Sequence, residues 1–430
     1  MNLPRFVHVR QSFPNRAIPD IPRHVHRELA ASGLAGRVPK GARVAVGVGS
    51  RGISNIATIT RAVIDFWKSQ GANPFLFPAM GSHGAATAEG QADVLAHYGI
   101  HEATMGVPVL SSLDVVSLGA TAEGIETFVD RNAFESDGIF LIPRIKWHTD
   151  FVGPIESGMF KMMAIGLGKF SGAQNYHTHA YKIGLERMIR SVGERVFASG
   201  KVLGGLAIQE GAHHETAGLV VLSSAGGCAA MLAHEEKLLA EVKSWKANVP
   251  ADPIDVLIVD EMGKNISGAG MDTKVINRSV YGGANCFADV PRIERVYVRG
   301  LTDLTYGSAV GVGLADVIHD RLLEQVDWNP TYINSLTAST PLAIQTPIHF
   351  ASDAEALAAI APTVGKHDLS QVTYCRIRNT MELMDALVSE NLLPQLNPNA
   401  HVISEPFAMN FDANGDFELI ETPPETLVHA

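Results

Sequence analysis

The chain has 430 residues, enough for two domains with large apolar cores. It contains 46% hydrophobic and 18% charged residues, with 45 acidic side chains against 34 basic ones. Because no basic run occurs, the composition argues against nucleic acid and anionic membranes as partners. The N-terminus shows no signal-peptide pattern, and the three cysteines are widely spaced, so we expect a soluble cytoplasmic protein.

Short apolar runs alternate with amphipathic helical patterns through the first half of the chain. Alternation of this kind predicts an α/β fold whose sheet is mostly parallel, with helices on both faces. The predicted strands are residues 43–49, 73–80, 138–145 and 162–168, and the predicted helices are residues 53–70, 87–98 and 180–198.

The segment NVPADP at residues 248–253 is a candidate domain boundary. We therefore predict an N-terminal domain over residues 1–250 and a smaller α/β domain over residues 251–430, with the active site in a cleft between them. In the second domain, strands are predicted at residues 255–261 and 292–300, and helices at 309–323, 354–361 and 381–387.

Polar side chains follow three of the predicted strands at the point where each strand ends. Gly-Ser-Arg-Gly occupies residues 49–52, Gly-Ser-His-Gly occupies 81–84, and Lys146 and His148 follow the third strand. In an open α/β sheet, ligands bind outside the carboxyl ends of the strands, and helix N-termini there attract anions. The residues expected to contact a ligand are Ser50, Arg51, Gly81, Ser82, His83 and His148. Each loop taken alone also fits an ordinary turn.

Residues 143–184 hold the highest density of groups that could carry chemistry, including His148, Lys161 and His177. Lys161 stands among apolar residues, where a lysine is costly unless it serves a site. An amine in an apolar cleft loses its proton more readily and becomes a nucleophile. A salt bridge with Glu156 is the structural alternative. Lys169 follows a glycine at the expected strand end, where we expect it to be solvated.

In the second domain, Lys264 lies in a glycine-rich loop at residues 263–270, directly after the strand end at Asp260 and Glu261. This group fits a substrate-binding loop or a charged turn equally well. The sequence contains no phosphate-binding GxxxxGK[ST] motif, no GxSxG nucleophile elbow and no cysteine-rich zinc pattern.

Taken in order, these residues resemble the nickel-pincer-nucleotide-dependent lactate racemase family over roughly residues 43–184. The family has an Arg after an early strand, a His after the next strand, a further His, a Lys ahead of an apolar run with Gly, and a His that follows Asn. The matching residues here are Arg51, His83, His148, Lys161 in GMFKMMAIG and His177 in NYH.

The resemblance implies a role for each matched residue. Lys161 would carry the nickel-pincer nucleotide covalently, and His177 would be the protein ligand of its nickel. His83 and His148 would act as acid and base on opposite faces of the substrate. Arg51 would hold the cofactor phosphate or polarise the substrate, while Lys264 would hold the substrate carboxylate.

The implied activity is inversion of the hydroxyl-bearing carbon of a 2-hydroxy acid by reversible hydride transfer. Val48 replaces the family's usual Asp, and the second half of the chain diverges from the family. We therefore expect another 2-hydroxy acid or a sugar acid as the substrate as readily as lactate. Cofactor-maturation proteins are the implied partners. The alternatives are a different metal-dependent hydrolase or lyase that uses the histidines directly, and a non-catalytic protein that binds a small anion or cofactor.

Overall fold

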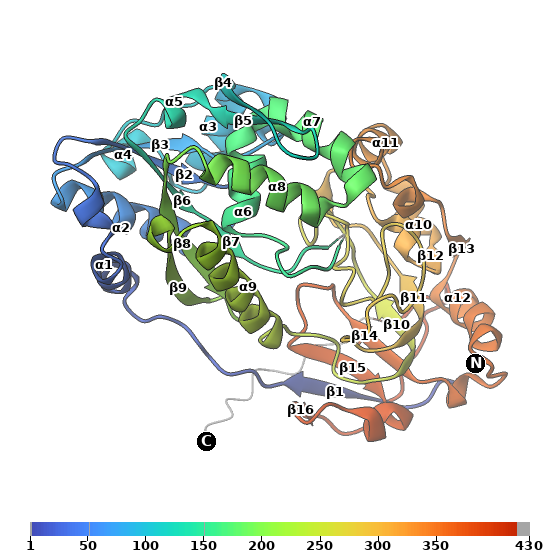
Figure 1. Cartoon of the computed structure of the whole chain (residues 1–430). Helices are drawn as coiled ribbons and strands as arrows, with labels where there is room; N and C mark the ends of the chain where they lie inside the picture. Colours follow the sequence, from blue (N-terminus) through green and yellow to red (C-terminus); the bar gives the residue numbers. More distant parts are fainter. Residues whose placement is uncertain (1, 51, 150, 419–430) are drawn as a thin grey trace. The chain divides into compact units, whose positions relative to one another are not determined.

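The computed structural model describes residues 2–50, 52–149 and 151–418, which divide into two compact units. One unit is Pro14–Lys246, and the other combines Met1–Phe13 with Ala247–Ala430 (Figure 1). The division lies close to the predicted boundary at residue 250. The first thirteen residues, however, belong to the unit of the C-terminal half, because β1 (Phe6–Gln11) pairs there with two strands from the end of the chain. The predicted cleft between the domains stays a prediction.

The sheet of the Pro14–Lys246 unit has the order β3-β2-β6-β8-β7, with β9 antiparallel at β8. The first five of these strands run parallel, which confirms the predicted α/β class. Since the chain goes from β2 to β3 on one side and later to β6 on the other, the strand order reverses at β2. The strands are β2 (Arg43–Val48), β3 (Asn73–Pro78), β6 (Gly138–Ile142), β7 (Arg144–Ile145), β8 (Val202–Glu210) and β9 (Thr216–Ser223).

Alternating side chains along these strands fill two cores. Val44, Val46 and Val48 face one core with helices α1 (Ile21–Ala31) and α2 (Ile56–Ser69). Ala45 and its neighbours on β3 and β6 face the other core with α8 (Leu185–Phe197) and α9 (Cys228–Ser244). Successive side chains of a strand point to opposite faces, so the apolar runs bury both sides of the sheet as predicted. The remaining elements of the unit are α3 (Ala88–His97), α4 (Glu102–Met105), β4 (Val115–Ala120), β5 (Glu126–Asp130) and α5 (Arg131–Phe134).

The strand predicted at residues 162–168 is wrong, because this segment is helical. Helix α6 (Met159–Lys161) continues through a π-helical turn (Met162–Gly166) into α7 (Leu167–Ile183). The helix predicted at 180–198 is in fact the end of α7 and the whole of α8, separated by Gly184 at φ 85°.

The second unit is built on one mixed sheet, in the order β13-β12-β11-β10-β14-β15-β1-β16. Strands β10 to β14 run parallel, and β15, β1 and β16 extend the sheet in antiparallel fashion. The strands are β10 (Ile254–Val259), β11 (Ile293–Val298), β12 (Val317–His319), β13 (Ile348–Phe350), β14 (Tyr374–Ile377), β15 (Asp385–Ser389) and β16 (Ala400–Val402), and the helices are α10 (Asp320–Glu324), α11 (Trp328–Thr337) and α12 (Asp353–Ile360).

Two helix predictions in this unit are wrong. Residues 309–323 include strand β12, and only their last residues enter helix α10. Residues 381–387 lead into strand β15, whose Leu387 pairs with both β1 and β14. Among the described residues, no helix combines the length and apolar character needed to cross a membrane.

Candidate functional site

The parallel strands of the Pro14–Lys246 unit all end at one edge of the sheet, and the predicted ligand-binding loops leave from that edge. Gly49 and Ser50 follow β2, residues 81–83 follow β3, and His148 follows β7. A reversal of strand order, as at β2, is where open α/β sheets bind their ligands. Arg51 lies outside the described residues.

Lys161 lies on the helical segment that covers the first two of these loops. A Cβ on Gly49 would lie 3.9 Å from Cε of Met162, the residue after Lys161. A Cβ on Gly81 would lie 3.2 Å from Cγ2 of Ile165 and 3.1 Å from Cβ of Ala173, tighter than ordinary van der Waals contact. Gly81 therefore permits the close approach of the Lys161 segment to the end of β3, whereas a Cβ on Gly49 would make an ordinary contact.

The segment does not continue as one straight helix, because it breaks at Lys169, which has φ 56° and ψ −156°. Residues other than glycine rarely adopt this conformation, which costs about 1–3 kcal/mol. In a straight helix, Ile165 and Ala173 would be separated by a rise of about 12 Å. Both side chains instead touch the same point beside Gly81, so the chain folds sharply at Lys169.

The helical arm after this break is fixed to strand β5. The Tyr176 hydroxyl accepts a hydrogen bond from the Phe128 backbone N–H at 2.9 Å, and the Asn175 amide donates to the Glu126 carbonyl at 2.9 Å. Burial raises the pKa of Tyr176 to about 12, so its hydroxyl stays protonated. His177 is the next residue of this arm, and its side chain lies outside the part that the structure describes.

Lys169 is fully buried, so the prediction of a solvated lysine is wrong. Its Nζ donates to the Pro78 carbonyl at 2.9 Å and to Oε1 of Gln91 at 2.5 Å, and lies 3.7 Å from Oδ2 of Asp130. Burial lowers the pKa of Lys169, and the charge of Asp130 partly offsets this effect. Sequence reasoning missed this group because its partners are distant in the sequence and only the folded chain brings them together.

The loop that carries His148 is held by two side chains that follow it. The Ser157 hydroxyl bonds to both the N–H and the carbonyl of Lys146, at 2.6 and 2.5 Å. Oε2 of the buried Glu156 accepts from the His148 backbone N–H at 2.6 Å, and its Oε1 pairs with Lys243 at 2.5 Å. The ring of His148 packs against Phe151, with 4.6 Å between centroids. Glu156 is therefore an anchor for the His148 loop.

A second buried acid, Glu235 on α9, holds the start of the Lys161 helix. Its Oε2 accepts from the Phe160 backbone N–H at 3.2 Å. Burial raises the pKa of Glu235 to about 8, which hydrogen bonds from the Phe160 and Met159 backbone only partly oppose. Nothing in the local sequence of α9 marked this residue, because its partner lies 75 positions earlier.

Lys264, the residue of the second domain that was predicted to contact the substrate, forms hydrogen bonds with residues of its own unit. Its backbone N–H donates to the Thr305 hydroxyl at 3.0 Å, and its Nζ donates to the Asn334 side chain on α11. Its predicted role toward the substrate is untested by these contacts.

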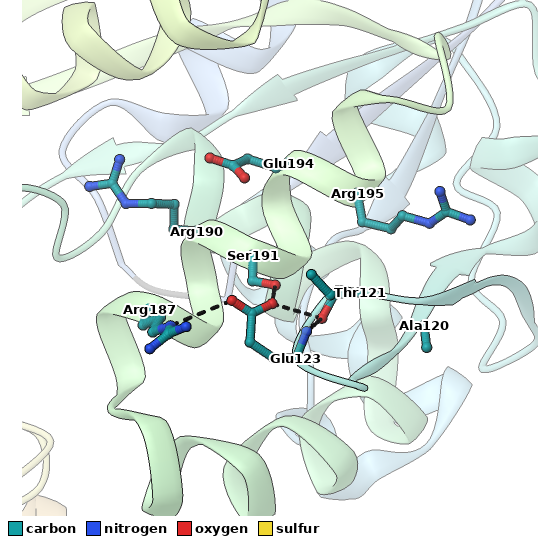
Figure 2. A pocket seen from close by; sticks show the side chains of 9 residues that line it. Ala120, Thr121, Glu123, Arg187, Arg190, Ser191, Glu194 and Arg195 are labelled. Carbon is teal, nitrogen blue, oxygen red and sulfur yellow. Dashed lines mark hydrogen bonds and ion pairs between the residues drawn. The ribbon is translucent and has the colours of Figure 1, made fainter.

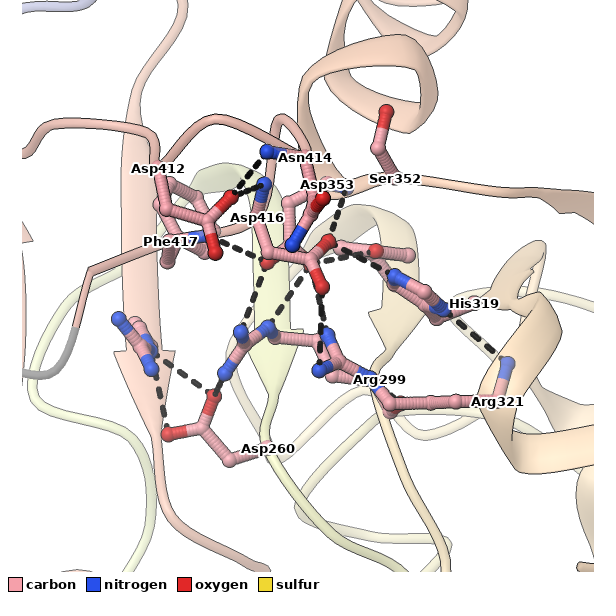
Figure 3. Close-up of polar contacts among 12 residues, drawn as sticks. Asp260, Arg299, His319, Arg321, Ser352, Asp353, Asp412, Asn414, Asp416 and Phe417 are labelled. Atoms are coloured by element: carbon pink, nitrogen blue, oxygen red, sulfur yellow. Dashed lines mark hydrogen bonds and ion pairs between the residues drawn. The ribbon is translucent and has the colours of Figure 1, made fainter.

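One further group in this unit has the composition of a metal site. Ligand atoms of His319, Asp353 and Asp416 lie within 4.8 Å of one another (Figure 3). However, Asp353 already accepts hydrogen bonds from Arg299 at 2.7 and 2.8 Å and from Tyr297 at 2.6 Å. A metal ion would have to displace these donors.

Both ring nitrogens of His319 also have hydrogen-bond partners within the protein. Its Nδ1 accepts from the Arg321 backbone N–H at 3.1 Å, which leaves Nε2 to donate to Asp416 at 2.8 Å. Burial alone would raise the pKa of Asp353, but the hydrogen bond and charge of Arg299, together with hydrogen bonds from Phe417 and Tyr297, hold that pKa below its usual value. The cluster is thus a closed ionic network rather than a vacant metal site.

A surface pocket of about 400 Å³ lies between the β4–β5 turn and helix α8 (Figure 2). Its arginines are engaged by the protein itself: Arg187 pairs with Glu123 at 3.4 Å, Arg190 with Glu186 at 2.6 Å, and Arg195 with the Leu118 carbonyl. None of the predicted site residues lines it.

Among known proteins, the chain resembles solved structures in its fold. No protein-family model matches the chain, and no curated protein matches it. A solved structure of a protein from Thermotoga maritima is 13% identical, with a TM-score of 0.50 over 78% of this chain and 85% of that one. The lactate racemase apoprotein from Thermoanaerobacterium thermosaccharolyticum is also 13% identical, with a TM-score of 0.46 over 92% of this chain and 96% of that one. At such identity the first likeness concerns the fold alone.

Proposed function

We propose that this chain is a racemase or epimerase that inverts the hydroxyl-bearing carbon of a 2-hydroxy acid, with a nickel-pincer nucleotide attached to Lys161. The observation that carries the proposal is the sharp fold of the helical segment at Lys169, beside the glycine loops that follow β2 and β3. Lys161 and His177 stand eight residues before and eight residues after this break. In a straight helix they would be separated by a rise of about 24 Å, too far for one small cofactor to join both.

The residues near the break have the chemistry that such a cofactor needs. An amine on Lys161 can form the covalent link, and an imidazole on His177 is a good nickel ligand. Gly81 lets the helical segment that carries Lys161 lie close to the end of β3. When bound, the cofactor would supply a hydride acceptor beside the substrate carbon.

The protein's own part in the reaction is binding and proton transfer. His83 and His148 leave the same sheet edge from different strands, so each can face the substrate from its own side. We assign one histidine to take the hydroxyl proton as the carbon loses hydride, and the other to serve the opposite enantiomer. Ser50, Ser82 and Arg51 would bind the cofactor or the substrate, and Lys264 would bind the carboxylate.

Intact mass and metal analysis of the full chain, produced together with cofactor-maturation proteins, tests this function. We expect a covalent mass increment with about one nickel per chain, and the loss of both in Lys161→Ala. Lys182→Ala, which removes an exposed lysine of the same helix α7, should retain both. Bound zinc on an unmodified chain would favour a hydrolase or lyase, and a bound anion without metal or turnover would favour a binding protein. Either result contradicts the proposal.

A further inference from the structure

The break in α7 combines two features that a simple helix kink does not need. Lys169 adopts a conformation normally reserved for glycine, although Gly166, Gly168 and Gly172 are all nearby. Its ammonium group is also taken completely out of water. A strained backbone and a buried cation persist only where the surrounding structure holds them, and such sites cluster at functional positions.

The buried contacts of Lys169 lead to the loop that carries His83. Its Nζ bonds to the carbonyl of Pro78, the last residue of β3, at 2.9 Å, and to Oε1 of Gln91 at 2.5 Å. The Gln91 amide in turn donates to the Met80 carbonyl at 3.2 Å and to the Gly81 carbonyl at 2.8 Å. The side chains of Lys169 and Gln91 therefore hold three backbone carbonyls just before His83.

The same lysine also connects the two helical arms to the sheet. Its charge lies 3.7 Å from Oδ2 of Asp130, the last residue of β5, the strand to which the second arm is fixed. Both side chains of this pair are completely buried, so solvent does not weaken their attraction. A change in the backbone at Lys169 would thus disturb its contacts with β5 and with the end of β3 at the same time.

We infer that Lys169 is a positioning residue that couples the fold of the Lys161 and His177 arms to the loop carrying His83. This inference rests on the proposed function, which gives Lys161, His177 and His83 their roles. Lys169 itself is assigned no contact with substrate or cofactor. Its ammonium is enclosed by Pro78, Gln91 and Asp130, which excludes it as a second attachment point. Lys169 acts only through the groups that it holds.

Hydrogen exchange of the full chain, followed by mass spectrometry, tests the coupling without any cofactor. In Lys169→Met, we expect amide exchange across residues 80–84 to accelerate about tenfold or more. Lys182→Met, an exposed lysine of the same helix, should exchange like wild type. Gln91→Glu keeps an acceptor for Lys169 but loses the donor to Met80 and Gly81, so it should loosen the same loop.

Loaded protein gives the second readout. Lys169→Met and Gln91→Glu should keep the adduct on Lys161 while the turnover number falls about tenfold or more. Exchange at residues 80–84 within about twofold of wild type in the folded variants would overturn the inference, and Gln91→Glu decides the matter if Lys169→Met does not fold. Absence of any adduct in wild type would instead overturn the proposed function, while faster exchange would still support the coupling.

Discussion

His83 and His148 are held at the sheet edge by the backbone around them. His83 directly precedes a short 3₁₀ turn, and the carbonyls before it are bound by Gln91. The His148 N–H is bound by Glu156, and its ring packs on Phe151. Both histidines are partly buried, and each is held through the backbone around it.

The two histidines should each be indispensable for interconversion. In a two-base reaction, one enantiomer needs the first histidine and the other enantiomer needs the second. We expect His83→Ala and His148→Ala each to lower racemisation by about 10²- to 10⁴-fold while the adduct on Lys161 persists. Chiral chromatography of the product and intact mass of the same sample measure both. His234→Ala, on the exposed face of α9, is the control, and near-normal racemisation in either site variant would refute its assigned role.

Glu235 should make stability depend on pH. Burial raises its pKa from 4.5 to about 8, so near neutral pH the folded protein keeps a proton that the unfolded chain has lost. The contribution of this group is therefore complete below pH 4.5 and is lost as the pH rises toward about 8. Within that window the free energy of unfolding falls by about 1.4 kcal/mol per pH unit.

Denaturant unfolding of wild type and Glu235→Gln measures this effect. A Gln oxygen can still accept from the Phe160 N–H but does not titrate. Between about pH 5.5 and about pH 7.5, wild type should lose about 2–3 kcal/mol relative to the variant. Parallel stability curves for the two proteins would show that Glu235 does not titrate in this range.

At the level of elements, strands β2, β3 and β6 of the first sheet could be predicted from their apolar runs, whereas β8 (Val202–Glu210) was not predicted. The run at residues 162–168 looked the same, but periodicity cannot separate a short buried strand from a buried helix. Its Met, Ala and Leu residues favour a helix, whereas Gly166 and Gly168 do not, and Ile165 is its single β-branched residue. Its short length, in contrast, fits a strand, so the local sequence alone does not decide between the two elements.

The break at Lys169 could not be predicted from its neighbours. A lysine after Gly168 ordinarily marks a solvated end, and only the distant groups Asp130 and Gln91 make its burial tolerable. Strand β1 was missed for a related reason, since its partner β15 lies more than 370 residues later. Contacts of this separation leave no local pattern in the sequence.

At the level of the whole molecule, the first and last parts of the chain belong to the same unit, and the middle part forms the other unit. Residues Met1–Phe13 and Ala247–Ala430 share one sheet, and the Pro14–Lys246 unit is inserted between them. One change of unit lies after Lys246, near the predicted boundary, and the other lies after Phe13. All described residues of the proposed cofactor site belong to the inserted unit, so this unit alone holds Lys161 and both histidines.

Peptide mapping of the cofactor-loaded full chain would identify the lysine that carries the cofactor. We expect a nucleotide-derived adduct on Lys161 and an unmodified Lys169, because the amine of Lys169 is enclosed by three protein groups. Lys161→Ala should then abolish both the adduct and racemisation of a 2-hydroxy acid. An adduct on Lys169, or racemisation by a chain that carries no adduct on any lysine, would show that Lys161 does not carry the cofactor.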